Sequence, residues 1–177
     1  MAGTDLVVIG AGPGGYVAAI RAAQLGMKVV IAEKDACGGT CLNYGCIPTK
    51  ALYKNAQVMG YMDRSREFGI EIDGYRLDME QVQARKNKIV KTLTGGVEYL
   101  LKSNKVAIEK GCAKIIKAGL VEVTGKDGTV KRLETKRILI ASGSKSSRLP
   151  IEGMDLEGVI TSKEALDMKT VPEEIVI

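Results

Sequence analysis

The chain of 177 residues contains no histidine, no tryptophan, one phenylalanine and only four cysteines. Without histidine, and without a second cysteine pair at ligand spacing, a metal centre is not expected. No apolar run reaches the roughly 18 residues that a membrane-spanning helix requires, because glycines interrupt the most apolar stretch. Met1 lies a few residues before the first predicted strand, which leaves no room for a leader peptide. We therefore expect a protein without metal, membrane span or secretory signal, placed in the cytoplasm, or in the mitochondrial matrix if a leader was removed.

Positive charge is in moderate excess but is spread along the chain. The formal net charge is +5, and lysines and arginines occur through 85–91, 102–117 and 126–137, mostly between acidic or apolar residues. A nucleic-acid surface would concentrate them on one face or stripe. The distribution predicts a solvated surface and no nucleic-acid partner.

The remaining composition is that of a folded α/β protein. Hydrophobic residues make up 45% of the chain and charged residues 27%, with 21 glycines. The length suits one domain, or one domain and the beginning of another. We expect a domain over 1–149, followed at 150–177 by a connection and the first strand of a second, truncated domain.

The hydrophobic pattern predicts a Rossmann-like fold with a parallel sheet, long helices and a small antiparallel meander. The first unit is strand 5–9, helix 13–25 and strand 28–33, a right-handed βαβ crossover. A second helical region covers 40–60. A long amphipathic helix covers 79–103, locally weakened by Gly95 and Gly96. Short strands follow at 106–108, 113–116, 120–123 and 129–133 as the meander, then a central parallel strand at 137–141 and a buried strand at 174–177.

A glycine motif follows the first predicted strand. Gly10, Gly12 and Gly15 have GxGxxG spacing where a strand ends and a helix begins, and Glu33 ends the second strand. In a dinucleotide-binding loop these glycines allow the tight turn, the approach of the pyrophosphate and close helix–sheet packing. The helix N-terminus attracts phosphates, and Glu33 would accept hydrogen bonds from a ribose diol and repel a 2′-phosphate. The motif predicts a dinucleotide site that disfavours NADP.

A cysteine pair defines the second motif. Cys41 and Cys46 are five positions apart, which in a regular helix exceeds the roughly 7 Å Cα limit for a disulfide, so a bridge requires a distorted turn. Gly45 and Pro48 are suitable causes of that distortion. A bridge in a strained, exposed turn is easily reduced, and a helix N-terminus lowers a thiol pKa. The pattern predicts a redox-active pair, with two buried free thiols as the alternative.

The other two cysteines, Cys37 and Cys112, are interpreted as bystanders. Cys37 lies close enough to the pair to confuse a count of reactive thiols.

The run 39–50, with the glycine motif before it and 140–144 after it, closely resembles the pyridine nucleotide disulfide reductases. The resemblance covers the whole chain, and the cysteine motif is highly specific. Within the family, Leu42, Asn43, Ile47 and Thr49 are most similar to the dihydrolipoamide dehydrogenases and count against mercuric and glutathione reductases.

The resemblance implies FAD across the first domain, Cys41 as the thiol that exchanges with dihydrolipoamide, Cys46 beside the flavin, and Lys50 near flavin N5, where a cation stabilises the reduced ring. Ser142 stands where the family usually has Thr and keeps the hydroxyl. The segment around Gly111 resembles the family's adenine-side contact. The FAD-binding residues implied are Gly10, Gly12, Pro13, Gly14, Gly15, Glu33, Lys34, Gly39, Thr40, Cys41, Lys50, Ala113, Ser142 and Gly143.

By the same resemblance, electrons pass from dihydrolipoamide on the lipoyl domains of a 2-oxo acid dehydrogenase or related complex, through Cys41 and Cys46 and FAD, to NAD. The full-length protein would be a homodimer. The NAD site and the family's His–Glu acid–base pair lie outside this chain, so we expect the chain alone to be inactive. A stand-alone flavin-binding redox module without turnover is the alternative from another functional class.

Overall fold

The computed structural model describes residues 3–177, which divide into two compact units. The first unit contains the residues up to 43 together with 92–145, and the second contains 44–91 together with 146–177. The expected boundary at residue 149 stays a prediction.

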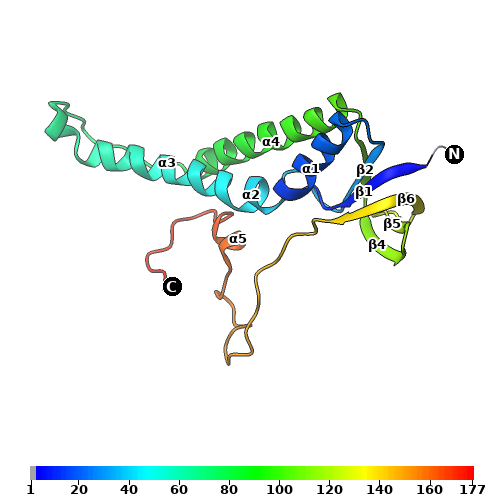
Figure 1. Cartoon of the computed structure of the whole chain (residues 1–177). Helices are drawn as coiled ribbons and strands as arrows, with labels where there is room; N and C mark the ends of the chain where they lie inside the picture. Colours follow the sequence, from blue (N-terminus) through cyan, green and yellow to red (C-terminus); the bar gives the residue numbers. More distant parts are fainter. Residues whose placement is uncertain (1–2) are drawn as a thin grey trace. The chain divides into compact units, whose positions relative to one another are not determined.

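One six-stranded sheet forms the centre of the first unit (Figure 1), with the order β3-β2-β1-β6-β5-β4. The strands β3, β2, β1 and the second part of β6 are parallel, whereas β4, β5 and the first part of β6 are antiparallel. The bounds are β1 Thr4–Ile9, β2 Val29–Glu33, β3 Ala107–Lys110, β4 Cys112–Lys117, β5 Leu120–Thr124 and β6 Val130–Ile140. The Rossmann-like α/β class is confirmed.

Two strand predictions are corrected by this sheet. The strands expected at 129–133 and 137–141 form one strand, β6, which pairs with β5 up to Glu134 and with β1 from Thr135. The apolar pattern is interrupted by 134–136, yet backbone pairing continues there because a neighbouring strand is available on either side. The strand expected at 106–108 is β3, which pairs parallel to β2 and is not part of the meander.

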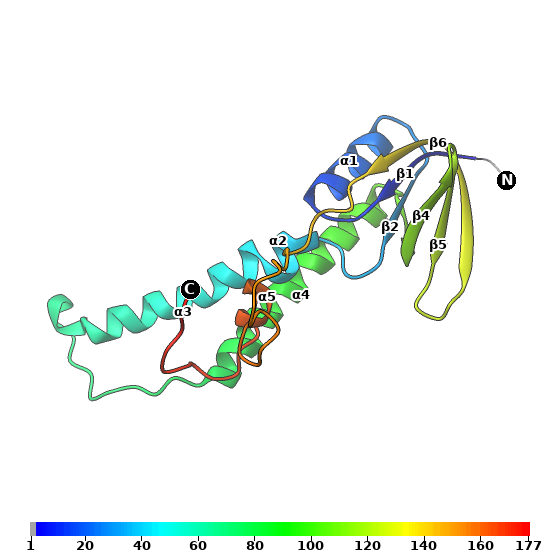
Figure 2. The ribbon, with the colours of Figure 1, turned by 90° about the horizontal axis from the view of Figure 1, so that it is seen from below.

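Helices cover one face of this sheet. Helix α1 (Pro13–Gln24) begins with Pro13, where the missing N–H costs nothing, and is followed by Gly26 with φ +89°. Its Ala19 packs with Val8 and Ile31 of the sheet and with Leu101 from the end of helix α4. Successive strand residues point to opposite faces, and Val7 belongs to a second cluster, with Ala32 of β2 and with Val121, Val123 and Leu133 of the meander. Figure 2 shows the strands of the meander from below.

Helix α4 (Met79–Ser103) confirms the predicted long helix, and it runs through Gly95 and Gly96 without interruption. Its residues up to Lys91 belong to the second unit. That unit also contains helix α3 (Cys46–Asp63), the short helix η1 (Ser65–Phe68) and helix α5 (Ser162–Ala165), which begins with a capping box at Thr161.

A buried lysine joins α4 to the segment after α5. The side chain of Lys86 is 3% exposed and donates hydrogen bonds to the carbonyl of Leu166 and the carboxylate of Asp167. The Gln83 amide donates to the carbonyls of Leu166 and Met168, at 3.2 and 2.8 Å. These contacts fix residues 166–168 against α4, because a buried ammonium requires such partners.

The final residues differ from the prediction. Residues 174–177 have no regular secondary structure, and Ile175, Val176 and Ile177 are exposed. A strand requires a pairing partner, and the described part of the chain pairs none with this apolar segment.

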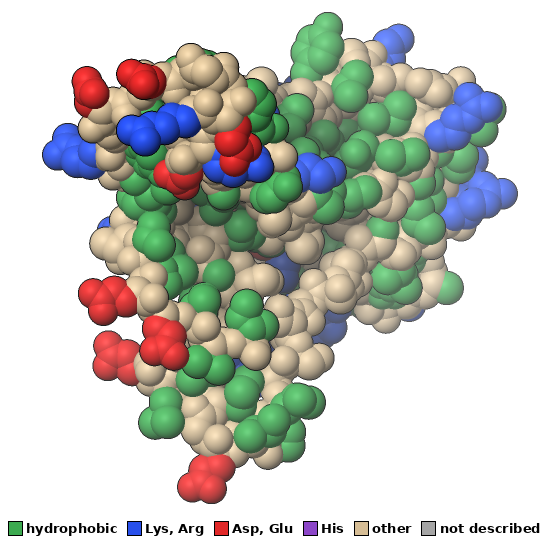
Figure 3. All heavy atoms as spheres, turned by 90° about the vertical axis from the view of Figure 1, so that its left-hand side faces the viewer, with side chains coloured by type: hydrophobic (Ala, Val, Ile, Leu, Met, Phe, Trp, Pro, Cys, Tyr) green, Lys and Arg blue, Asp and Glu red, His purple; other side chains and the backbone are tan. Residues whose placement is uncertain are grey.

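The surface carries both charged and apolar side chains. On the face drawn in Figure 3, hydrophobic side chains lie among charged ones, and the lysines and arginines there form no continuous patch. Within the described residues, no helix is long and apolar enough to cross a bilayer.

The Lys86–Asp167 pair allows a stability test. Asp167→Asn removes the carboxylate that pairs with a buried ammonium, so we expect the free energy of unfolding in urea to fall by about 1–3 kcal/mol, less than for a fully buried pair because Asp167 is 69% exposed. Lys86→Met replaces the ammonium by an apolar chain of similar size. It should lower the free energy of unfolding by less, because Gln83 still donates a hydrogen bond to the Leu166 carbonyl.

A matched control is Asp155→Asn, which breaks the exposed Arg148–Asp155 pair and should leave the urea midpoint unchanged. A larger loss for Lys86→Met than for Asp167→Asn would contradict this interpretation of the buried pair.

Candidate functional site

The carboxyl ends of the parallel strands meet at one edge of the sheet. Because β1, β2 and the end of β6 run in the same direction, Gly10 after β1, Glu33 at the end of β2 and Ser142 after β6 lie along this edge (Figure 1). The edge is closed by backbone hydrogen bonds from Gly10 N–H to the Ala32 carbonyl and from Ala141 N–H to the Ile9 carbonyl, both 2.8 Å. In open α/β sheets this is where ligands bind.

Two glycines of the loop after β1 are required by internal packing. A Cβ on Gly10 would lie 2.3 Å from the Ala141 carbonyl oxygen, and Gly10 has φ +101°. A Cβ on Gly15 would lie 1.8 Å from the Gly10 carbonyl oxygen. Both distances are far below van der Waals contact with backbone, so only glycine permits this close approach of loop, helix and β6.

The other two glycines of the loop, Gly12 and Gly14, are not required by packing within the chain. Gly12 has φ −72°, which any residue adopts, and a Cβ there would meet only Gly39 Cα at an ordinary 3.7 Å. A Cβ on Gly14 would meet nothing within 4 Å. The absence of side chains at Gly12 and Gly14 therefore leaves space above the loop.

The same loop ends at the N-terminus of α1. No side chain caps this end, Gly12 is the N-cap, and the first turn carries no acidic residue. N–H groups of an uncapped first turn and the helix dipole attract an anion. The open space and the uncapped turn together fit a pyrophosphate.

Glu33 is tied to the loop through its carboxylate. Its Oε2 accepts a hydrogen bond from Ala11 N–H at 2.7 Å, and its Oε1 accepts one from Asp35 N–H at 2.9 Å. Each carboxylate oxygen has a further lone pair, so ribose hydroxyls can still donate to Glu33. The sequence predicted the ribose contact but not the bond to Ala11, because it depends on β1 and β2 being adjacent in the sheet.

The turn before helix α2 (Gly39–Tyr44) packs against the glycine loop. Gly38 N–H donates to the Ala11 carbonyl at 2.8 Å, and a Cβ on Gly39 would lie 2.6 Å from Gly12 Cα. Thr40, at the start of α2, is exposed, as is Lys34 after β2. Gly39 therefore lies directly against the glycine loop, with Thr40 next to it in the chain, and their contact with a pyrophosphate stays a prediction.

Cys37 belongs to the core beneath this turn. It is 1% exposed and packs in the cluster that contains Val8 and Ile31. Burial, with the Glu98 and Glu33 carboxylates adding to it, raises the pKa of the Cys37 thiol to about 11. A thiol with this pKa is inert at neutral pH, in agreement with its interpretation as a bystander.

The two cysteines of the motif lie on different helices. Cys41 is half-buried in α2, in the first unit, and Cys46 is the exposed first residue of α3, in the second unit. The helix is interrupted at Gly45, which has φ −138° and ψ −114°. Pro48 does not cause the break, because it is buried in the first turn of α3, where its missing N–H is tolerated.

Lys50 lies one turn after Cys46 on α3. Residues four apart share a helix face, so the exposed Cys46 and Lys50 lie on the same side while Pro48 and Ala51 are buried. Arg85 of α4 holds this helix, since its guanidinium donates to the Ala51 carbonyl and Asn55 Oδ1, both at 2.9 Å. The sequence did not indicate this role for Arg85, because its pattern indicated only one of many charged residues on a solvated surface.

The remaining predicted contacts come from β4 and from the segments after β3 and β6. Gly111 N–H, after β3, donates to the Glu33 carbonyl at 2.9 Å, and Ala113, half-buried in β4, packs against the cluster that contains Val7. Ser142 and Gly143 are exposed, and Gly143 has φ +72°.

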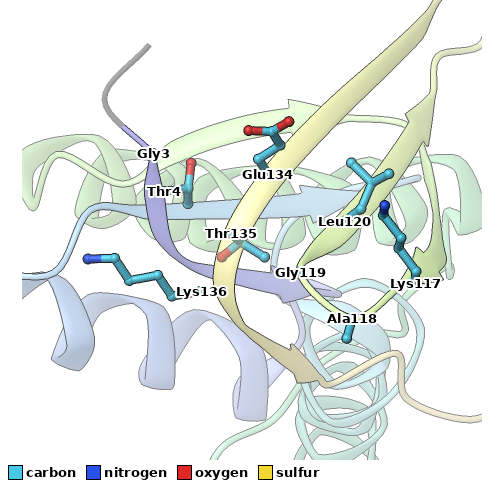
Figure 4. A pocket seen from close by; sticks show the side chains of 9 residues that line it. All are labelled: Gly3, Thr4, Lys117, Ala118, Gly119, Leu120, Glu134, Thr135 and Lys136. Atoms are coloured by element: carbon cyan, nitrogen blue, oxygen red, sulfur yellow. The ribbon is translucent and has the colours of Figure 1, made fainter.

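A hollow at the other end of the sheet is separate from this edge. It is lined by Thr4, Lys117, Glu134 and Lys136 among others (Figure 4), and Thr4 begins the strand whose far end carries the glycine loop. Lys136 is paired with Asp5 at 2.7 Å. No predicted site residue lines the hollow.

The sequence has clear relatives among known proteins. A family model described as pyridine nucleotide-disulphide oxidoreductase matches residues 4–177. The mitochondrial dihydrolipoyl dehydrogenase of Dictyostelium discoideum is 47% identical over 175 residues, covering 98% of this chain and 36% of that protein. The Bos taurus enzyme of the same name is 45% identical over 177 residues, with 98% and 35% covered. The chain thus spans about a third of the length of these relatives.

A solved structure shares the fold. The HOCl-induced flavoprotein disulfide reductase RclA of Escherichia coli, determined as a Cu(II) complex, matches with a TM-score of 0.79 and 28% identity, covering 96% of this chain and 35% of that one.

The raised pKa of Cys37 predicts the order of thiol labelling. At pH 8 a thiol with a pKa near 11 is only about one part in a thousand thiolate, and thiolate is the reactive form. Iodoacetamide followed by peptide mapping should modify the exposed Cys46 and Cys112 long before Cys37. The Cys37 rate should rise about tenfold for each pH unit up to its pKa. Equal rates at Cys37 and Cys112 at pH 8 would contradict the burial of Cys37.

Proposed function

Because the chain belongs to the pyridine nucleotide-disulphide oxidoreductase family, we propose that it forms the FAD-binding, redox-disulfide part of a dihydrolipoamide dehydrogenase. The observation that carries the proposal is the loop after β1, where Gly12 and Gly14 leave space that no internal packing requires. The identity of 45–47% to dihydrolipoyl dehydrogenases favours this branch over glutathione or mercuric reductases. It also favours the enzyme over a stand-alone flavin-binding module.

The residues at the sheet edge fit an FAD molecule. The uncapped first turn of α1 would receive the pyrophosphate, with Pro13 and Gly14 beside it, and Glu33 would accept the ribose hydroxyls. The further contacts proposed are Gly10, Gly15, Lys34, Gly39, Thr40 and Cys41 around the loop, Ala113 near the adenine side, Ser142 and Gly143 after β6, and Lys50 toward the flavin ring.

The proposed chemistry is a thiol–disulfide exchange at Cys41 and Cys46. With this pair oxidised, one thiolate of dihydrolipoamide attacks the Cys41 sulfur, the Cys41–Cys46 bond breaks, and Cys46 leaves as a thiolate. The second substrate thiol then displaces Cys41, so that lipoamide carries the new disulfide and both cysteines hold the two electrons. FAD, when bound, supplies the acceptor that returns the pair to the disulfide, and NAD receives those electrons elsewhere in a longer protein.

Two of the chain's own cations support this chemistry. The exposed Lys50 lies one turn after Cys46 on α3, and its positive charge would stabilise negative charge on a reduced flavin ring. Arg85 keeps α3 in place through Ala51 and Asn55.

Other requirements lie outside the chain. The sequence contains no histidine, so a general base that activates the substrate thiol must come from additional residues. We propose that the complete protein is a homodimer, binds NAD, and acts on lipoyl domains of a 2-oxo acid dehydrogenase or related complex. Its relatives are named as mitochondrial, so the matrix is proposed alongside the cytoplasm.

Gly12→Ala separates cofactor binding from folding. The new methyl group fits the folded chain, because its nearest neighbour would be 3.7 Å away and φ is −72°, so the urea midpoint should not fall. It would occupy the space proposed for the pyrophosphate, so FAD affinity, measured by quenching of flavin fluorescence, should fall at least about tenfold.

Gly95→Ala is the matched control, since the folded chain also has room for a methyl group there: a Cβ on Gly95, in α4, meets nothing within 4 Å. It should leave FAD affinity unchanged. Unchanged FAD affinity in Gly12→Ala would remove the observation on which the cofactor site rests.

A further inference from the structure

The side chain of Asn43 folds back across the beginning of its own helix. Its Nδ2 donates hydrogen bonds to the Cys37 carbonyl at 3.2 Å and to the Gly39 carbonyl at 2.9 Å. Both partners are acceptors, so the amide nitrogen must face them. One NH₂ group thus closes the turn that precedes α2, which is a common use of asparagine near helix ends.

The turn closed by Asn43 also contacts the glycine loop. Gly38 N–H donates to the Ala11 carbonyl, and Gly39 packs directly on Gly12. The backbone of this turn has φ +101° at Gly38 and +59° at Gly39, which is the left-handed region that favours glycine and is outside regular helix or strand geometry. It is therefore held from two sides, by the loop and by Asn43.

Cys41 lies between the two ends of this brace. It follows Gly39 by two positions and precedes Asn43 by two positions on α2. Any movement of the first turn of α2 relative to the glycine loop would carry the half-buried Cys41 thiol with it.

We propose that Asn43 is a positioning residue for Cys41. Its two hydrogen bonds fix the first turn of α2 against the glycine loop and hold the Cys41 sulfur where exchange with a substrate thiol takes place. The proposal rests on the exchange role of Cys41 given above. Asn43 acts through the backbone carbonyls of Cys37 and Gly39.

The test is the alkylation rate of Cys41 relative to Cys112 in the same reduced molecule, by iodoacetamide and peptide mapping at pH 8. Cys112 is exposed on β4, so the ratio corrects for reagent and general conditions. Asn43→Leu keeps the size and removes both donors, and the ratio should rise at least about fivefold as the turn opens. Asn43→Ser retains one hydroxyl donor that reaches an i−4 carbonyl, so it should give an intermediate ratio.

Asn104 provides a matched control. Its Nδ2 donates to the Leu100 carbonyl at 2.8 Å, also four residues earlier, at the end of α4. Asn104→Leu should leave the ratio at the wild-type value. An unchanged ratio in Asn43→Leu, or an equal rise in Asn104→Leu, would overturn the proposal. If Asn43→Leu does not fold, a wild-type ratio in Asn43→Ser overturns it instead.

Failure of this proposal can be distinguished from failure of the proposed function. A separate measurement, peptide mapping of the oxidised wild-type chain, determines whether Cys41 and Cys46 form a disulfide. A missing disulfide would remove the exchange role, whereas a normal disulfide with an unchanged alkylation ratio would remove only the role of Asn43.

Discussion

At the carboxyl edge of the sheet, backbone segments lie so close together that a side chain would not fit between them. Gly10 lies against Ala141, and Gly15 lies against Gly10. With Gly10 and Gly15 lacking Cβ atoms, the loop after β1 lies against both the start of α1 and the end of β6. A larger residue at either position would separate these elements, and the first turn of α1 would no longer point along the edge. The Glu33 bond to Ala11, the contact with the turn at Gly38 and the proposed phosphate site all depend on this approach.

The consequence is a continuous set of backbone contacts from the sheet to the reactive cysteine. Glu33 and Gly38 both bond Ala11, Gly39 packs on Gly12, and the helix that follows carries Cys41. Positions proposed to bind the cofactor and positions proposed to orient a thiol are therefore neighbours along one edge of the sheet. This arrangement suits chemistry in which a dithiol and a flavin exchange electrons, because both must keep a fixed relation to the same loop.

Much of this could be predicted because it depends on local pattern. The strand–glycine–helix sequence at 5–25, the acidic end of β2 and the long helix at 79–103 follow from spacing and periodicity alone. The bonds of Glu33 to Ala11, Arg85 to Ala51 and Lys86 to Leu166 could not be predicted, since they join residues distant in sequence. The same holds for β3 and β6, whose partners are decided by the sheet order, and for 174–177, where an apolar pattern indicated a strand but none forms.

The central claim is that FAD lies at this edge with Cys46 beside it. The most direct measurement is the visible absorption spectrum of the purified chain with FAD, recorded anaerobically before and after stoichiometric dithiothreitol, for the wild type and for Cys46→Ser. We predict a bound-flavin band that gains long-wavelength absorbance on reduction in the wild type and not in the variant. A chain that stays colourless after FAD is added, or a bound flavin whose spectrum responds identically in both proteins, would contradict the account.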